Sequence, residues 1–366
     1  MERQLNSKKH FAERCENEEN MIDLKLIEKL TNACGVSGNE GEVRAIIRAE
    51  IERHVDGIQV DALGNLIAFK KPAGRAAGGK IPKVMLAAHM DEVGLMVTSV
   101  DKAGYLKFSR VGGIDNRVLL AKRVVIGKDR IPGVIGIKPI HFLKRKGENN
   151  KVTPSDDLAI DIGAATQEEA QKLVAVGDYA AFDTAFEDWG PVIKAKAFDD
   201  RIGCYLMIEL LKGKYPFPLH AAFTTQEEVG LRGARVAAHR VRPDIAFVLE
   251  GTGAGDMPQP VEKDDSRMPR LGQGPVVTIM DRSVFCDKGL VQLLTGTARE
   301  KRIPFQIKKP GIGGTDAGRI HIANEGVRTV VLAIPARYIH SPTCLMHKRD
   351  IANGLKLMQA ALKKVK

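Results

Sequence analysis

The chain has 366 residues, 44% of them apolar and 28% charged, which is ordinary for a globular protein and long enough that two domains are expected. No apolar run approaches the roughly 20 residues that cross a bilayer, and the polar first twenty residues lack the apolar core of a signal peptide, so the sequence predicts a cytoplasmic protein without a membrane partner. The net charge of +11 arises between residues 70 and 150, where 17 Lys and Arg stand against 6 Asp and Glu, but these cations are dispersed without interleaved aromatics, which argues against a nucleic-acid groove.

The first part of an α/β domain is predicted over residues 21–93, after a polar N-terminal extension at residues 1–20. Asp23 can accept a hydrogen bond from the first turn of a helix, and apolar residues with helical spacing follow it. Further on, the run 84–88 is short and wholly apolar, which predicts a buried strand. That strand ends at His89.

Residues 94–178 differ in sequence pattern from the segments on either side. Short β-rich runs alternate there with Gly, Pro and Asp, and helical periodicity is largely limited to residues 166–174. This pattern predicts a small, barrel-like β-domain inserted into the α/β domain.

The α/β pattern returns over residues 179–366. We expect a mostly apolar helix over residues 200–211 and strands over residues 221–225, 245–249 and 327–334. Alternation of this kind predicts a mainly parallel sheet with helices on both faces. In such sheets ligands gather at the carboxyl ends of the strands.

Five potential metal ligands lie at the ends of these predicted strands or in the turns after them, with a spare carboxylate beside one of them. In chain order they are His89, Asp199, Glu228, Glu250 and His340, and the spare carboxylate is Glu227. A carboxylate shared by two cations, with one His and one acid for each, suits a two-metal hydrolytic site. The spare Glu would then act as general base on the water between the metals.

Local context supports two of these positions. Asp91 lies two residues after His89, so an extended chain places both on one side, and Asp91 can hold the imidazole. Glu227 and Glu228 follow an apolar strand, where adjacent carboxylates repel unless a cation or a shared proton compensates them. Neighbouring side chains diverge, so one of the two can bind a metal while the other faces the water.

Two positions stay open on sequence grounds. Asp199 directly precedes a helix and is equally explained as an N-cap. Asp200 competes with it for the bridging position. Asp256, in the loop after the strand, competes with Glu250 for the last carboxylate.

Several short runs, taken together, resemble a known family. They are residues 35–40 (GVSGNE), 89–94 (HMDEVG), 198–201 (FDDR), 226–230 (QEEVG), 314–317 (GTDA) and 337–341 (RYIHS). The combination is similar to the tetrahedral, glutamyl-aminopeptidase-like di-metal metallopeptidases, and the resemblance runs from about Met21 to the C-terminus.

The resemblance implies a role for each candidate ligand. Asp199 would bridge two divalent metal ions, either zinc or cobalt. His89 and Glu250 would complete one metal site, and Glu228 and His340 the other.

The resemblance also implies roles for two further residues, and the activity and assembly of the protein. Glu227 would be the general base, and Asp91 the partner of His89. The family removes N-terminal residues from peptides, and its inserted β-domain forms dimers that assemble into a hollow tetrahedral dodecamer.

We therefore predict a cytosolic di-metal aminopeptidase acting on short peptides through metal-activated water. Two alternatives remain: a carboxypeptidase or deacylase using the same site, and, from another class, a nucleic-acid-binding protein. The preferred N-terminal residue stays open, because acidic, basic and large apolar residues are all compatible with the sequence.

Overall fold

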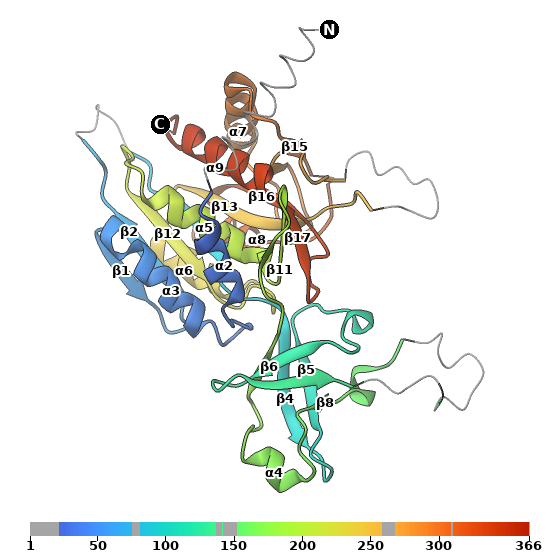
Figure 1. The fold of residues 1–366 in the computed structure, drawn as a ribbon. Coiled ribbons are helices and arrows are strands. Elements are labelled where there is room, and N and C mark those ends of the chain that lie inside the picture. The colour runs from blue at the N-terminus through green and yellow to red at the C-terminus, as the bar shows by residue number, and fades with distance from the viewer. Residues whose placement is uncertain are drawn as a thin grey trace, which may run out of the picture.

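The computed structural model describes residues 22–74, 81–136, 141, 152–257, 268–308 and 310–365. An α/β domain and a smaller β-barrel domain form its two parts (Figure 1). The N-terminal extension predicted at residues 1–20 lies outside the described residues. Within the described ranges, no helix is both long and apolar enough to cross a membrane.

The α/β domain is built on an eleven-stranded mixed sheet. Four parallel strands form its centre, in the order β12 (Leu219–Thr224), β3 (Val84–His89), β13 (Ile245–Gly253) and β16 (Arg328–Arg337). These strands are almost wholly buried, as expected of parallel strands covered on both faces. The predicted parallel arrangement is therefore confirmed for the centre of the sheet.

Antiparallel pairs complete both edges of the sheet. The additional strands are β1 (Gly57–Val60), β2 (Leu66–Lys70), β10 (Glu187–Asp188), β11 (Val192–Ala195), β14 (Val276–Thr278), β15 (Gln306–Ile307) and β17 (Cys344–His347). Only β15 departs from this pattern, because it runs parallel to β14.

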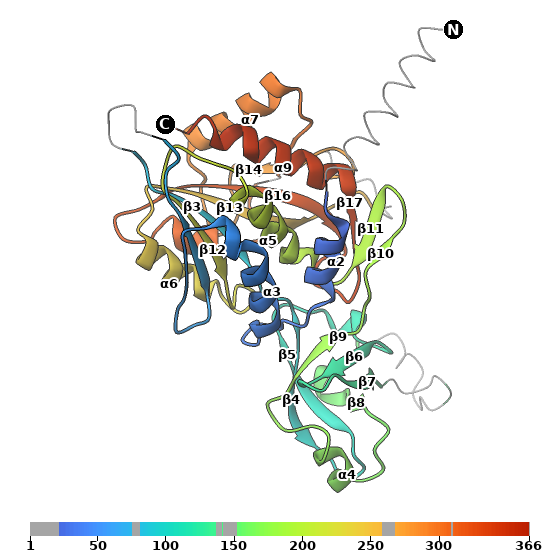
Figure 2. The ribbon, with the colours of Figure 1, turned by 60° about the vertical axis from the view of Figure 1, so that its left-hand side comes forward.

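Helices cover both faces of the sheet (Figure 2). Helix α5 (Phe198–Leu211) packs along β3 and β13 and is apolar nearly all round, which is typical of a helix buried between layers. Beside it lie α2 (Leu24–Asn32), α3 (Gly41–Ile51) and α9 (Lys348–Leu362), with α7 (Lys288–Lys301) against α9. On the other face, α6 (Arg232–Val241) and α8 (Ala317–Ile320) pack against each other. As predicted, Asp23 caps α2 through Leu26 N–H.

The inserted domain is a closed barrel in the strand order β4-β5-β8-β7-β6-β9. Its strands are β4 (Gly94–Val100), β5 (Leu106–Val111), β6 (Arg123–Ile126), β7 (Ile131–Ile135), β8 (Ile160–Asp161) and β9 (Tyr179–Phe182), with helix α4 (Gln167–Gln171) beside them. A separate hydrophobic core fills this barrel. The last strand, β9, lies just beyond residue 178, where we placed the end of the insertion.

The strand that carries Glu250 is longer than the sequence indicates. We expected the strand over residues 245–249 to end at Glu250, but β13 continues to Gly253. The glycines at 251 and 253 favoured a loop, yet the ladder to β16 continues as far as the pair Gly253 and Ala336. Glu250 therefore lies within a strand, and its position is set by that ladder.

Candidate functional site

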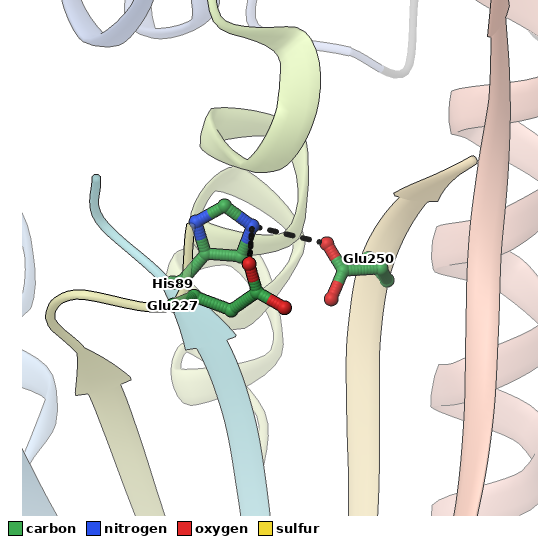
Figure 3. A group of neighbouring side chains, drawn as sticks. All are labelled: His89, Glu227 and Glu250. Carbon is green, nitrogen blue, oxygen red and sulfur yellow. Dashed lines mark ion pairs between the residues drawn. The ribbon is translucent and has the colours of Figure 1, made fainter. Parts of the chain in front are cut away.

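His89 ends β3 at the carboxyl edge of the parallel strands, and its side chain is 1% exposed. Its Nε2 lies 3.3 Å from Asp199 Oδ1, 3.3 Å from Glu250 Oε1 and 3.9 Å from Glu227 Oε2. Figure 3 shows Glu227, in the turn after β12, and Glu250, on β13, both pointing toward His89 at the end of β3. Three residues that are far apart in the sequence therefore surround one small space.

His340 forms the second half of the arrangement. Its Nε2 lies 3.5 Å from Asp199 Oδ2 and 3.5 Å from Glu228 Oε2. Asp199 thus presents one carboxylate oxygen to each histidine. We call the six residues His89, Asp199, Glu227, Glu228, Glu250 and His340 the acid–histidine cluster. The side chains of Glu227 and Glu228 diverge as expected, because Glu227 lies near His89 and Glu228 near His340.

Both histidines are oriented by backbone carbonyl groups. His89 Nδ1 lies 3.1 Å from the carbonyl oxygen of Asp91, and His340 Nδ1 lies 3.0 Å from that of Gly113. A carbonyl oxygen only accepts, so Nδ1 donates in each ring and Nε2 is the nitrogen left to face the carboxylates. This is the orientation that a cation shared between the imidazole and the carboxylates would require. Gly113 follows β5 of the barrel, so the inserted domain contributes to the site.

The carboxylate of Asp91 links the strand end that carries His89 to the turn that carries Glu227 and Glu228. The sequence indicated its carboxylate as the partner of His89, and Oδ1 is 3.4 Å from Nδ1, farther than the carbonyl oxygen. That carboxylate also accepts hydrogen bonds from the backbone N–H groups of Glu227 and Glu228, at 3.0 and 3.1 Å, and from the Ser37 hydroxyl at 2.5 Å. Asp91 therefore fixes the turn that carries the two glutamates.

Asp200, the rival to Asp199, is held by other groups. Its Oδ2 accepts from His89 N–H at 3.1 Å, and its Oδ1 accepts from Gly203 N–H at 2.9 Å. A Cβ at Gly203 would lie 2.5 Å from both carboxylate oxygens, so the close approach requires glycine. Although Asp200 lies near Asp199 and Glu250, only Asp199 reaches both histidines.

Asp256, the rival to Glu250, lies in an ion pair. Its carboxylate accepts from Arg337 at 2.8 and 2.7 Å and from Leu271 N–H at 3.1 Å. Glu250 is 4% exposed, and its Oε2 is buried without a hydrogen-bond partner in the structure. A buried carboxylate oxygen without a partner is costly, so a cation at this point would compensate it.

The electrostatics show an excess of negative charge. Burial raises the pKa of Glu250 to about 8, with Asp199 adding to the effect and His89 opposing it. Burial and then Asp199 raise the pKa of Glu228 to about 7. The hydrogen bond to Asp199 raises the pKa of His340 to about 10. Crowded carboxylates of this kind are compensated by protons or by cations.

Sequence reasoning assigned no role to Asp316. This side chain is fully buried and accepts from the Thr224 hydroxyl through Oδ2, while Oδ1 has no partner in the part of the chain that the structure describes. Burial raises its pKa to about 6. It starts helix α8 within the GTDA run, and the only sequence signal for it was that run's resemblance to the family.

The backbone is constrained around the cluster. Gln226, directly before the two glutamates, and His340 both adopt a left-handed conformation, each with φ of 57°. This region is uncommon for residues other than glycine, and such strain concentrates at functional sites. The Gln226 N–H donates to Glu40 Oε1 at 3.2 Å, which helps to hold the turn.

Two groups within the cluster have the make-up of metal sites. Ligand atoms of His89, Glu227 and Glu250 lie within 4.8 Å of one another, and so do those of Asp199, Glu228 and His340. Imidazole nitrogen and carboxylate oxygen together suit zinc and related divalent transition metals. A cavity of about 280 Å³ opens directly beside the cluster.

Residues 64–357 match the M42 glutamyl aminopeptidase family. The chain belongs to this family. Among M42 relatives, a provisionally named aminopeptidase of Acetivibrio thermocellus is 40% identical over 94% of this chain and 99% of its own length. The lysyl aminopeptidase of Pyrococcus furiosus is 35% identical over 94% of this chain and 98% of its own.

Solved structures agree with this membership. A TET aminopeptidase from a marine sediment thaumarchaeon has a TM-score of 0.86 at 37% identity, covering 94% of this chain and 97% of that one. The TET1 peptidase of Pyrococcus horikoshii, described as able to assemble into a tetrahedron or a large octahedral shell, has a TM-score of 0.81 at 33% identity, covering 93% and 99%. The M42 chain is thus an aminopeptidase, and the predicted fold class and reaction are confirmed.

Proposed function

We propose that this M42 aminopeptidase works with two divalent metal ions held by the acid–histidine cluster. The observation that carries the proposal is the position of Asp199, whose two carboxylate oxygens face His89 Nε2 at 3.3 Å and His340 Nε2 at 3.5 Å. Asp199 would bridge the ions. His89 with Glu250, and His340 with Glu228, would complete the two sites, which zinc or cobalt would fill.

The residues fit these ions on structural grounds. Glu250 Oε2 is buried without a hydrogen-bond partner among the described residues, and both histidines are held with Nε2 toward the carboxylates. When bound, the ions would lower the pKa of a water molecule between them and polarise the scissile carbonyl group.

The chain's own residues would supply the proton transfers. Glu227 Oε2 lies 3.9 Å from His89 Nε2, farther than the oxygens of Asp199 and Glu250. Burial raises the pKa of Glu227 well above its ordinary value. A carboxylate with a raised pKa accepts a proton from water and returns it to a leaving amine. Asp91 would keep Glu227 in position through the backbone hydrogen bond at 3.0 Å.

We also propose the substrate class, the assembly and the compartment. The substrates would be short peptides with a free amino terminus. The inserted barrel would form dimers that build a tetrahedral dodecamer, which is supported by the assemblies described for the TET1 relative. The four cysteines in the described part of the chain are free thiols, which fits the reducing cytoplasm.

The test is hydrolysis of aminoacyl-nitroanilides by protein stripped of metal and then refilled with zinc or cobalt. We expect activity to vanish on stripping and to return on refilling. N-acetylated aminoacyl-nitroanilides are the control, because an aminopeptidase requires a free amine. Hydrolysis of the blocked substrates at the same rate would support a deacylase or another amidase instead, and no hydrolysis with any metal would contradict the proposal.

A further inference from the structure

The two histidines of the acid–histidine cluster are oriented by carbonyl groups from different domains. The carbonyl oxygen that faces His89 Nδ1 belongs to Asp91, two residues further along the same strand end. The carbonyl oxygen that faces His340 Nδ1, at 3.0 Å, belongs to Gly113, which lies 227 residues away in the inserted barrel. The α/β domain therefore orients the first histidine by itself, whereas the second depends on the barrel.

His340 is also held less by packing than His89. Its side chain is 38% exposed, against 1% for His89. It lies in the turn between β16 and β17, where its backbone has the left-handed φ of 57°. The hydrogen bond to Gly113 therefore contributes more to the orientation of this ring than the corresponding hydrogen bond does at His89.

Two consecutive glycines let the barrel approach this half of the cluster closely. A Cβ at Gly113 would lie 3.3 Å from His340 Nδ1. A Cβ at Gly112 would lie 3.3 Å from Glu228 Cβ and 2.8 Å from Val93 Cγ1, and the φ of Gly112 is +87°, which favours glycine. The Gly112–Gly113 turn thus lies directly against both His340 and Glu228.

Contacts within the barrel hold this turn in place from both sides. Before it, Val111 at the end of β5 pairs with Gly94 at the start of β4. After it, the carbonyl oxygen of Ile114 accepts from Arg110 Nη1 at 2.6 Å. Ile114 is 4% exposed and belongs to the hydrophobic core of the barrel. The position of the Gly113 carbonyl group is therefore set by the barrel.

We propose that the Gly112–Gly113 turn is a positioning element for the metal site of His340 and Glu228, and that it controls the affinity of that site alone. The inference rests on the proposed function, because it requires two metal ions in the acid–histidine cluster. A hydrogen bond from the ring nitrogen that does not bind metal fixes the orientation of an imidazole ligand and raises its basicity. Disturbing this turn would weaken the ion at His340, while the ion at His89 keeps its own support.

The main test is Gly113→Ala in the full-length protein. The added methyl group would lie 3.3 Å from His340 Nδ1, so the ring has to turn away from its carbonyl partner. We expect the zinc affinity of one site to fall about 10–100-fold, the usual effect of losing such a partner, while the other site is unchanged. Competition against chelators of graded affinity measures both sites. Unchanged affinities, or an equal loss at both sites, would overturn the inference.

A second variant loosens the turn from a distance. Arg110→Leu removes the hydrogen bond that braces the turn, and we expect it to weaken the same site by a smaller factor. One control is Gly136→Ala, in an exposed barrel glycine whose Cβ would lie at an ordinary contact distance of 3.5 Å from a backbone oxygen. The other is Arg123→Leu, which removes an exposed arginine that pairs with Asp183 at 2.6 Å. Both controls should bind zinc as the wild type does.

Double variants identify which site is affected. In the background of His340→Ala, adding Gly113→Ala should cause no further loss of zinc affinity, because the ring on which the turn acts is absent. In the background of His89→Ala, the same change should have its full effect on the remaining ion. A full effect in both backgrounds would show that the turn supports the fold in general, and it would overturn the inference.

The two proposals fail differently. If the wild-type protein binds neither zinc nor cobalt, the proposed di-metal chemistry itself is contradicted. If the wild type binds two ions and Gly113→Ala binds both as tightly, the metal sites stand and only the role of the Gly112–Gly113 turn is wrong.

Discussion

Two neighbouring clusters of buried charge differ in how their carboxylates are neutralised. The first is the acid–histidine cluster. The second, which we call the Glu92 cluster, consists of Glu92, Lys196 and Arg201. Glu92 and Lys196 are each 3% exposed and Arg201 is 1% exposed. Lys196 Nζ lies 2.6 and 2.7 Å from the two oxygens of Glu92, and Arg201 lies 3.0 Å from one of them.

The difference appears in the pKa values. In the Glu92 cluster, burial opposes ionisation, but Lys196 and Arg201 outweigh it and lower the pKa of Glu92. In the acid–histidine cluster the carboxyl pKa values of Glu228 and Glu250 are raised to about 7 and about 8. The chain thus supplies its own cations to the Glu92 cluster. We infer that this cluster has a structural role and that the acid–histidine cluster is completed by cations from solution.

The largest expected effect separates chemistry from metal binding within the acid–histidine cluster. Glu227→Gln keeps the shape of the side chain and removes its ability to accept a proton. We expect kcat to fall by about 10²–10⁴-fold, while metal content measured by elemental analysis stays near that of the wild type. Full turnover would refute the role of general base, and loss of one metal would make Glu227 a ligand.

The next effect tests the claim that the Glu92 cluster is structural. Glu92→Gln leaves Lys196 and Arg201 buried with only polar partners, and breaking a buried pair in this way costs about 3–5 kcal/mol. The free energy of unfolding in urea measures this loss.

Its control is Glu187→Gln, which removes an exposed acid that pairs with Lys194 at 2.7 Å. That exposed pair should matter little. The double variant Glu92→Gln/Lys196→Met should recover part of the lost stability, since it removes an uncompensated cation. Equal unfolding free energies for Glu92→Gln and Glu187→Gln would remove the contrast between the clusters.

A third prediction concerns pH. Without metal, Glu228 and Glu250 have folded pKa values of about 7 and about 8, above the ordinary 4.5. The unfolded chain therefore loses these protons first, so their contribution to stability is full below pH 4.5 and lost as the pH rises through 7 and 8. His340, with a pKa of about 10 against 6.5, acts in the same direction at higher pH.

Thermal unfolding of the metal-free enzyme should accordingly show stability that falls between pH 5 and pH 8. Refilling with zinc should remove or reverse that slope, because metal binding favours the deprotonated ligands. Glu92 has a lowered pKa, so its contribution to stability changes with pH in the opposite direction. That change occurs only below the ordinary pKa of a glutamate, outside this window. A flat profile without metal would show that the excess negative charge is compensated in some other way.

The smallest effect concerns a support of the cluster. Ser37→Ala removes the hydroxyl group that donates to Asp91 at 2.5 Å, and a hydrogen bond to a charged group contributes about 1.5–3 kcal/mol. We expect a stability loss in that range and a modest fall in metal affinity, measured by chelator competition. The control is Thr31→Ala, which removes a buried hydroxyl group that donates to the Ile27 carbonyl oxygen at 2.9 Å. This variant should lose some stability without any change in metal affinity.

Much of the site was predictable because its signals are local. The apolar run before His89, the paired acids at 227 and 228, and the alternation of strands and helices can all be read from neighbouring residues. Parallel strands bring their carboxyl ends to one edge, so the sequence alone predicted that these residues meet. The short β-rich runs of residues 94–178, separated by Gly, Pro and Asp, likewise predicted the β-rich insertion.

Tertiary structure decided what depends on partners distant in the chain. Asp200 is held by His89, 111 residues away, and Asp256 by Arg337, 81 residues away. Lys196 neutralises Glu92 across 104 residues. Spacing along a chain determines which residues share a face or a strand end, but the direction of a carboxylate and the presence of a counter-ion depend on packing between elements.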